Sequence, residues 1–260
     1  NATFQNMIKL GNTSKAILLI LVIILCVLRS YSATRTATSS GNWSNTATWG
    51  GNPVPTASDD VTINNGINVT VNAAAYCNTL TTANSGTLTI SGTNTLTVTG
   101  LINMFRPSAN NTSFTIAVGT GSLVAGALTM NATTTTRNNI ITISTGTVTI
   151  NGTVTTGTTG CQFVFTGNGL LKFGGSFSGG PASLTAANGT IEYTGTAPVI
   201  QAFTGNYYNL VYSGNGTTAN PSGNLNIQGN LLNTGGGTLN FYARNVSLSG
   251  TTVSNTIDGF

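Results

Sequence analysis

The sequence predicts an all-β protein built as a right-handed parallel β-helix, or β-solenoid. The first observation is a short module that repeats along the chain, most clearly at residues 86–90, 146–150, 189–193 and 237–241. The second is the alternation of apolar and small polar residues within each copy, which predicts a strand with one buried face. The third is a composition rich in Thr, Asn and Gly, which suits short strands joined by tight turns. Self-similarity at a period of roughly 20–50 residues is typical of solenoids and related arrays.

The N-terminal segment has the organisation of an export signal. An apolar run of thirteen residues, 16–28, follows Lys9 and Lys15 and precedes Arg29 and a small-residue stretch. This order is typical of a secretory signal peptide, so we predict one over residues 1–33, with Met7 as the true start and residues 1–6 upstream of it. The run is shorter than the roughly 20 residues of a membrane-spanning helix, and an uncleaved anchor is the alternative. After cleavage we expect no association with a membrane.

Residues 34–60 differ from the repeats that follow, because they contain both tryptophans and two of the six prolines. We predict that this segment is an N-terminal cap in which Trp43 and Trp49 cover the open end of the first coil. The alternative is an aromatic platform for sugar rings, since aromatic faces attract apolar C–H surfaces.

Residues 61–260 carry the strand pattern and form the predicted solenoid, with a possible subdivision near residue 196, where Thr196, Ala197 and Pro198 interrupt the alternation. The clearest copies of the module are 60, 43 and 48 residues apart. These spacings fit two or three coils of about 20 residues each and argue against one fixed coil length.

Antiparallel β-sandwich repeats are the competing fold. They would show tight hairpin signals at regular intervals. Asn64–Gly66 and Asn215–Gly216 are such signals, so this alternative stays open from the sequence.

The charge distribution excludes several classes of function. After residue 33 the chain has five basic and four acidic residues, all scattered, and nucleic-acid binding would need a basic stripe. Histidine is absent, which excludes catalysis by a nucleophile–histidine pair. The acids, Asp59, Asp60, Glu192 and Asp258, do not suggest a facing pair of carboxylates. We therefore expect neither an enzyme nor a cofactor.

Asp59 and Asp60 are weak candidates for a calcium site, because carboxylates are preferred ligands of Ca²⁺. The competing interpretation is a turn in which an aspartate accepts a backbone N–H before a strand begins. The two cysteines after the signal, Cys77 and Cys161, are predicted to be buried as small apolar residues, with a disulfide as the alternative in an exported protein.

Two stretches resemble a known group of proteins. Residues 41–55 (GNWSNTATWGGNPVP) and 58–63 (SDDVTI) are similar to the start of secreted β-helical surface proteins of gliding bacteria, many of them exported by the type IX route, and to the opening of the G8 domain. Residues 189–195, 207–214 and 223–231 are similar to repeats of the same bacterial group. The resemblance implies an extracellular or cell-surface location and a structural or adhesive role.

From these observations we expect a secreted structural or adhesive segment of a larger bacterial surface protein, with extracellular glycans or surfaces as partners and an oligomeric state that the sequence leaves open. The first alternative is weak carbohydrate binding on a set of aromatic rings: Trp43, Trp49, Tyr207, Tyr208 and Tyr212. The second is ice binding on rows of Thr-x-Thr, at 87–89, 95–97, 97–99, 147–149 and 153–155.

Overall fold

The computed structural model describes residues 32–242, 244–249, 253–254 and 257–258. The predicted signal peptide and its start at Met7 lie outside the described residues, apart from Ser32 and Ala33. Residues 34–260 form one compact unit. In the described part of the chain, no helix has the length and apolar character needed to cross a membrane.

The described residues of this unit form strands and one 3-10 turn, η1 (Thr46–Trp49). The strands are β1 (Thr34–Ala37), β2 (Gly41–Asn42), β3 (Asp60–Ile63), β4 (Ile67–Val71), β5 (Ala75–Cys77), β6 (Thr79–Thr82), β7 (Gly86–Ile90), β8 (Thr95–Met104), β9 (Thr112–Val118), β10 (Ser122–Met130), β11 (Arg137–Ile143), β12 (Thr147–Ile150), β13 (Val154–Thr156), β14 (Cys161–Phe165), β15 (Leu170–Phe173), β16 (Phe177–Gly179), β17 (Ser183–Thr185), β18 (Thr190–Tyr193), β19 (Asn209–Tyr212), β20 (Leu225–Ile227), β21 (Leu231–Asn233), β22 (Leu239–Asn240), β23 (Val246–Leu248), β24 (Val253–Ser254) and β25 (Ile257–Asp258).

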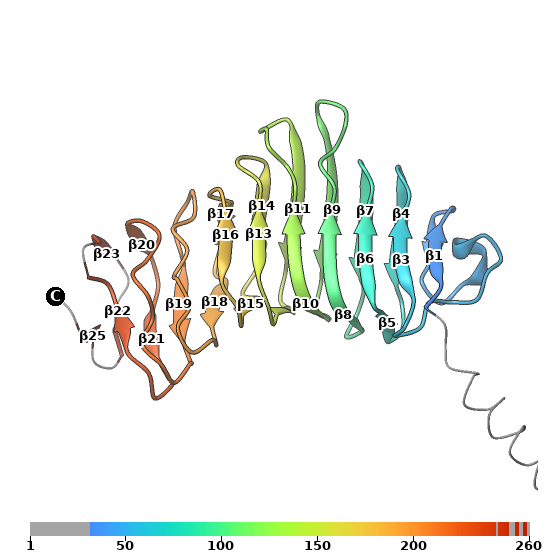
Figure 1. Ribbon diagram of the computed structural model, residues 1–260. Helices are drawn as coiled ribbons and strands as arrows, with labels where there is room; N and C mark the ends of the chain where they lie inside the picture. The colour runs from blue at the N-terminus through green and yellow to red at the C-terminus, as the bar shows by residue number, and fades with distance from the viewer. Residues whose placement is uncertain (1–31, 243, 250–252, 255–256, 259–260) are drawn as a thin grey trace, which may run out of the picture. The chain divides into compact units, whose positions relative to one another are not determined.

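Every pairing between these strands is parallel, and each joins a strand to its counterpart one coil later. Successive coils lie side by side from β1 to β25 (Figure 1). The predicted parallel β-solenoid is confirmed, and the antiparallel sandwich is wrong. Asn64–Gly66 lies between β3 and β4, which belong to different sheets, so this turn signal forms a corner of a coil and not a hairpin.

Each coil has three faces. Face A contains β1, β3, β6, β13 and β16, with residues 101–104 of β8 and 127–130 of β10. Face B is the seven-stranded sheet of β2, β4, β7, β9, β11, β14 and β17. Face C contains β5, β12, β15, β18, β19 and β21, with residues 95–98 of β8 and 122–125 of β10. Faces A and C share one 14-stranded sheet because β8 and β10 bend through both.

The core follows from the alternation within the strands. In β9, for example, Phe114, Ile116 and Val118 are buried while the residues between them are partly exposed. The inward residues stack in rows from coil to coil; one row on face B contains Leu88, Ile116, Ile141, Phe163 and Leu184. Each coil therefore buries its apolar residues against its neighbours, as repeat proteins do.

Coil length varies, as the spacing of the modules predicted. Residues paired in the register of neighbouring coils are 19 positions apart at Asp60 and Thr79, and 28 apart at Thr87 and Thr115. The corner between faces C and A is formed by glycines in successive coils. At Gly126 an added Cβ would lie 2.3 Å from the carbonyl oxygen of Thr99, so a side chain does not fit there.

Residues 34–59 form the first coil, and Asp60, the last residue of the predicted cap, begins β3. β1 and β2 pair with β3 and β4, and η1 is joined to this coil by a hydrogen bond from Thr48 Oγ1 to the carbonyl of Asn42 at 2.8 Å. The sequence suggested a possible subdivision near residue 196. The ladder of face C continues past this residue without a break, because β18 pairs with β19.

Candidate functional site

The two tryptophans are buried in the first coil. Trp43 is 2% exposed and Trp49 is fully buried, and their rings meet edge to face with centroids 4.9 Å apart. Trp49 Nε1 donates to the carbonyl of Trp43 at 2.7 Å. Neither ring presents a face to solvent. The two tryptophans therefore do not form the aromatic platform for sugar rings that the sequence left as an alternative.

Two of the three candidate tyrosines are also buried. The hydroxyl of Tyr212 donates to the carbonyl of Gly216 at 2.7 Å and accepts from its N–H at 3.1 Å, which closes a turn. Tyr207 is 1% exposed, and Tyr208 is partly exposed. The five aromatic residues singled out in the sequence therefore form no shared surface.

Asp59 and Asp60 have structural partners. Asp59 Oδ2 accepts from the N–H and the hydroxyl of Thr56, at 2.8 and 2.9 Å, and lies 3.6 Å from Nε of Arg35. Asp60 Oδ1 accepts from Asn78 Nδ2 and Thr79 Oγ1, at 2.8 and 2.7 Å. Asp59 therefore accepts a backbone N–H in a turn before β3, which is the arrangement that the sequence suggested as the alternative to a calcium site. Within the described residues, no group of three or more metal-ligating side chains of the His, Cys, Asp or Glu type occurs.

The cysteines are free and buried. Burial raises the pKa of Cys77 to about 12, with smaller contributions from Asp60 and Asp59, and burial also raises the pKa of Cys161. The thiol of Cys161 contacts the carbonyls of Met130 and Ala132. Both residues act as small core side chains, as the sequence favoured.

The Thr-x-Thr motifs lie on all three faces, so they do not form one surface. Residues 87–89 belong to face B, 147–149 to face C and 153–155 to face A. The register instead assembles a different row on face A, which we call the face A column: Thr36, Thr62, Thr81, Asn103, Thr129, Thr155 and Ser178. Sequence reasoning missed this row because its members are separated by a whole coil of variable length.

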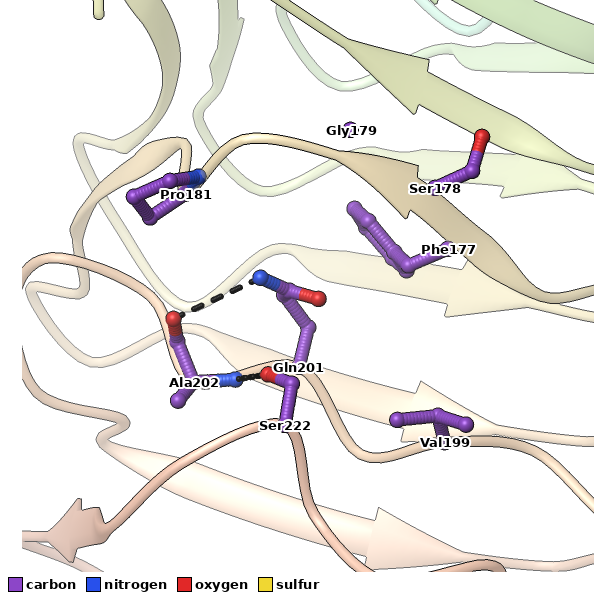
Figure 2. Close-up of a pocket in the computed structure, with 8 residues that line it drawn as sticks. All are labelled: Phe177, Ser178, Gly179, Pro181, Val199, Gln201, Ala202 and Ser222. Carbon is purple, nitrogen blue, oxygen red and sulfur yellow. Dashed lines mark hydrogen bonds between the residues drawn. The ribbon is translucent and has the colours of Figure 1, made fainter. Parts of the chain in front are cut away.

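A groove of about 420 Å³ opens where the ladder of face A breaks (Figure 2). β16 pairs with β13, but within the described part of the chain no backbone hydrogen bond joins it to residues 198–202 of the next coil. Pro198 has no N–H to donate to a neighbouring strand. The ladder resumes one coil later, where Val199 pairs with Ala219.

Two buried tyrosine hydroxyls hold the backbone of Gln201 beside this groove. The N–H of Gln201 donates to the hydroxyl of Tyr193 at 3.1 Å, and the hydroxyl of Tyr207 donates to the carbonyl of Gln201 at 2.5 Å. The two hydroxyl oxygens are 3.0 Å apart. Since Tyr207 gives its proton to Gln201, the bond between the tyrosines is donated by Tyr193. Burial raises the pKa of Tyr193 to about 12 and the pKa of Tyr207 well above its usual value, so both stay protonated.

The sequence held one signal for this groove. Thr196, Ala197 and Pro198 interrupt the alternation, and Pro181 follows β16 in the preceding coil. Prolines in neighbouring coils indicate a place where a ladder cannot continue, although they do not identify the side chains that line the opening.

Comparison of the chain with known protein families, curated proteins and solved structures finds no match. The β-solenoid fold stands on the structure itself. The likeness to surface proteins of gliding bacteria and to the G8 domain stays a prediction.

Proposed function

We propose that this chain is a structural and adhesive β-solenoid that is exported and works outside the cell, as a segment of a larger surface protein. The proposal is supported first by the architecture. A parallel ladder that is unbroken on face C, with a stacked apolar core, forms a quasi-one-dimensional body that can present one extended face to a partner surface.

The observation that carries the adhesive role is the face A column. Its seven members all bear a hydroxyl or amide group and follow one another in register from β1 to β16. Neighbouring members are about 4.8 Å apart, the usual distance between paired strands. Such a row offers repeated hydrogen bonds to a neutral, hydroxylated surface such as a polysaccharide.

Isosteric substitution on face A tests this role. The variant with Thr62→Val, Thr81→Val and Thr129→Val keeps the shape and strand preference of the side chains and removes three hydroxyls. We expect the amount of protein retained on a cellulose-coated quartz-crystal microbalance to fall at least threefold, because hydrogen-bonded contacts are lost and apolar groups replace them.

The matched control is the same substitution on face B, at Thr70, Thr89 and Thr142, which also point outward. It should retain the parent level of binding. Equal losses in the two variants, or no binding by the parent protein, would contradict an adhesive role for face A.

The same column favours a second candidate function, the binding of ice or ordered water. Five of its seven residues are threonines, which offer a methyl and a hydroxyl group at a regular spacing. Thermal hysteresis of the parent protein and of the face A variant measures this directly. Ice that grows unmodified at high protein concentration would eliminate this function and leave adhesion standing.

A further inference from the structure

The side chain of Gln201 is presented to the groove as an unused hydrogen-bonding group. Gln201 is 9% exposed, and its amide lies in the middle of the lining residues (Figure 2). Its Nε2 makes one long contact, 3.4 Å from the carbonyl of Ala202, and its Oε1 has no hydrogen-bond partner in the described part of the chain. This acceptor is therefore open to hydrogen bonds from water or from a ligand in the groove.

The position of this amide is held by the core beneath it. The two tyrosine hydroxyls bind the N–H and the carbonyl of Gln201, so its backbone is anchored at both ends. The next residue, Ala202, donates its N–H to Ser222 Oγ at 2.7 Å. A fixed backbone limits the positions that the side chain can take, so less conformational freedom is lost when a ligand binds.

The walls of the groove are partly apolar and rigid. The ring of Phe177 packs edge to face against Phe173 and Phe203, with centroids 4.7 and 5.6 Å apart. Pro181, Val199 and Ala202 form the rest of the apolar lining. A ligand that fits must therefore have an apolar side that can lie against these groups.

The polar lining is neutral. Ser222 contributes a hydroxyl beside the Gln201 amide, whereas the hydroxyl of Ser178 is hydrogen-bonded to Thr155 Oγ1 at 3.0 Å. Among the described residues that line the groove none is charged. Ser222 Oγ already accepts from Ala202 and keeps its proton to donate. An ionic ligand would lose hydration here without gaining an opposite charge.

We propose that this groove binds a neutral saccharide, with one hexopyranose ring held between the Phe177 wall and the Gln201 amide. Sugar hydroxyls both donate and accept, which matches the Gln201 amide and the Ser222 hydroxyl, and the C–H face of the ring matches the apolar wall. The volume suits a single ring better than a long chain. This site goes beyond the adhesive role of face A and does not depend on it.

The test is binding of the full chain to a glycan array of neutral and acidic saccharides, followed by titration of the best neutral ligand by NMR. We expect binding to neutral hexose-terminated glycans, at least tenfold weaker in Gln201→Met, which keeps the length of the side chain and removes the amide. The affinity should be the same at 50 and 500 mM NaCl, since no ion pair contributes.

Gln162→Met is the matched control, because Gln162 points outward on β14 of face B, away from the groove. It should bind like the parent. Circular dichroism of both variants checks that the fold is kept. The proposal is overturned if the parent binds no neutral glycan at 20 mM, if acidic glycans alone are bound, or if Gln201→Met binds like the parent while folded.

Loss of adhesion in the face A variant with unchanged glycan binding would separate the two roles. The opposite result, glycan binding lost in Gln201→Met with adhesion to cellulose intact, would separate them equally well.

Discussion

At the scale of single residues, the clearest feature of the core is a hydrogen-bond set shared by two buried tyrosines and one backbone segment. Tyr193, Tyr207 and the backbone of Gln201 form such a set, with both tyrosine rings buried among Phe173 and Phe203. A buried polar group is tolerated when all its partners are present, and its loss leaves the others unsatisfied.

The first prediction concerns Tyr207→Phe, which removes the donor to the Gln201 carbonyl and the acceptor for Tyr193. We expect the free energy of unfolding to fall by about 1–3 kcal/mol in urea denaturation. The double variant Tyr193→Phe with Tyr207→Phe should cost less than the sum of the two single changes, because the two groups share one set.

Tyr208→Phe is the control for this prediction. Tyr208 is partly exposed, and no described contact uses its hydroxyl. Its stability should match that of the parent. If the losses in free energy of unfolding at positions 193 and 207 were additive, the two tyrosines would not share one hydrogen-bond set.

The second prediction is a loss of stability at high pH. The pKa of Cys77 and that of Tyr193 are raised by burial to about 12, from ordinary values of 9.0 and 10.0. Above pH 9 the unfolded chain loses these protons while the folded chain keeps them, so ionisation favours unfolding. Stability should be level up to about pH 9 and fall as the pH rises towards 12.

Urea denaturation at pH 8, 9, 10 and 11 measures this fall. Cys77→Ala and Tyr193→Phe each remove one raised pKa, so each should show a shallower decline than the parent, measured from its own value at pH 8. A parent protein whose stability does not change between pH 8 and 11 would rule out these buried protonated groups.

At the scale of elements, the corners decide how coils stack. The third prediction is that Gly126→Ala destabilises the protein by about 1–3 kcal/mol, because the new methyl group would overlap the carbonyl of Thr99 in the coil below. The control is Gly236→Ala, since an added Cβ there has no atom within 4 Å. Thermal unfolding should show a clearly lower Tm for Gly126→Ala, and similar Tm values for both variants would contradict close stacking at the corner.

Strands and their inward faces could be predicted from the sequence, whereas the neighbours of each strand could not. The alternation placed Leu88 and Ile90 in the core because side-chain direction follows from a period of two. The face A column depends on register across coils of 19 to 28 residues, and no local pattern encodes it. The packing of Trp43 and Trp49 at the end of the first coil was predicted from the sequence, whereas the edge-to-face contact between their rings depends on how that coil folds.

The groove, too, could be predicted only in part from the sequence. The interruption at residues 196–198 was visible in the sequence as a possible subdivision, whereas the groove is formed by residues of three successive coils. Gln201 has no motif around it, and its role depends on Tyr193 and Tyr207, which belong to two different coils. Of the aromatic candidates, Tyr207 lies near the groove as a support for Gln201 and not as a platform for sugar.

At the scale of the whole described unit, the protein is a single stack in which every coil repeats the same three faces. Position along the stack is counted in coils, so the distance between two outward residues of one column follows from the number of coils between them. This relation is specific to parallel stacking in register and is absent from a sandwich of hairpins.

The most direct test of the stacked-coil structure is a pair of distances along the face A column, measured by double electron–electron resonance with spin labels on introduced cysteines. Thr36→Cys with Thr129→Cys spans four coils, and Thr36→Cys with Thr155→Cys spans five. At about 4.8 Å per coil, we predict separations of about 19 and 24 Å. Separations that do not increase by about one strand spacing from the first pair to the second would contradict the parallel solenoid.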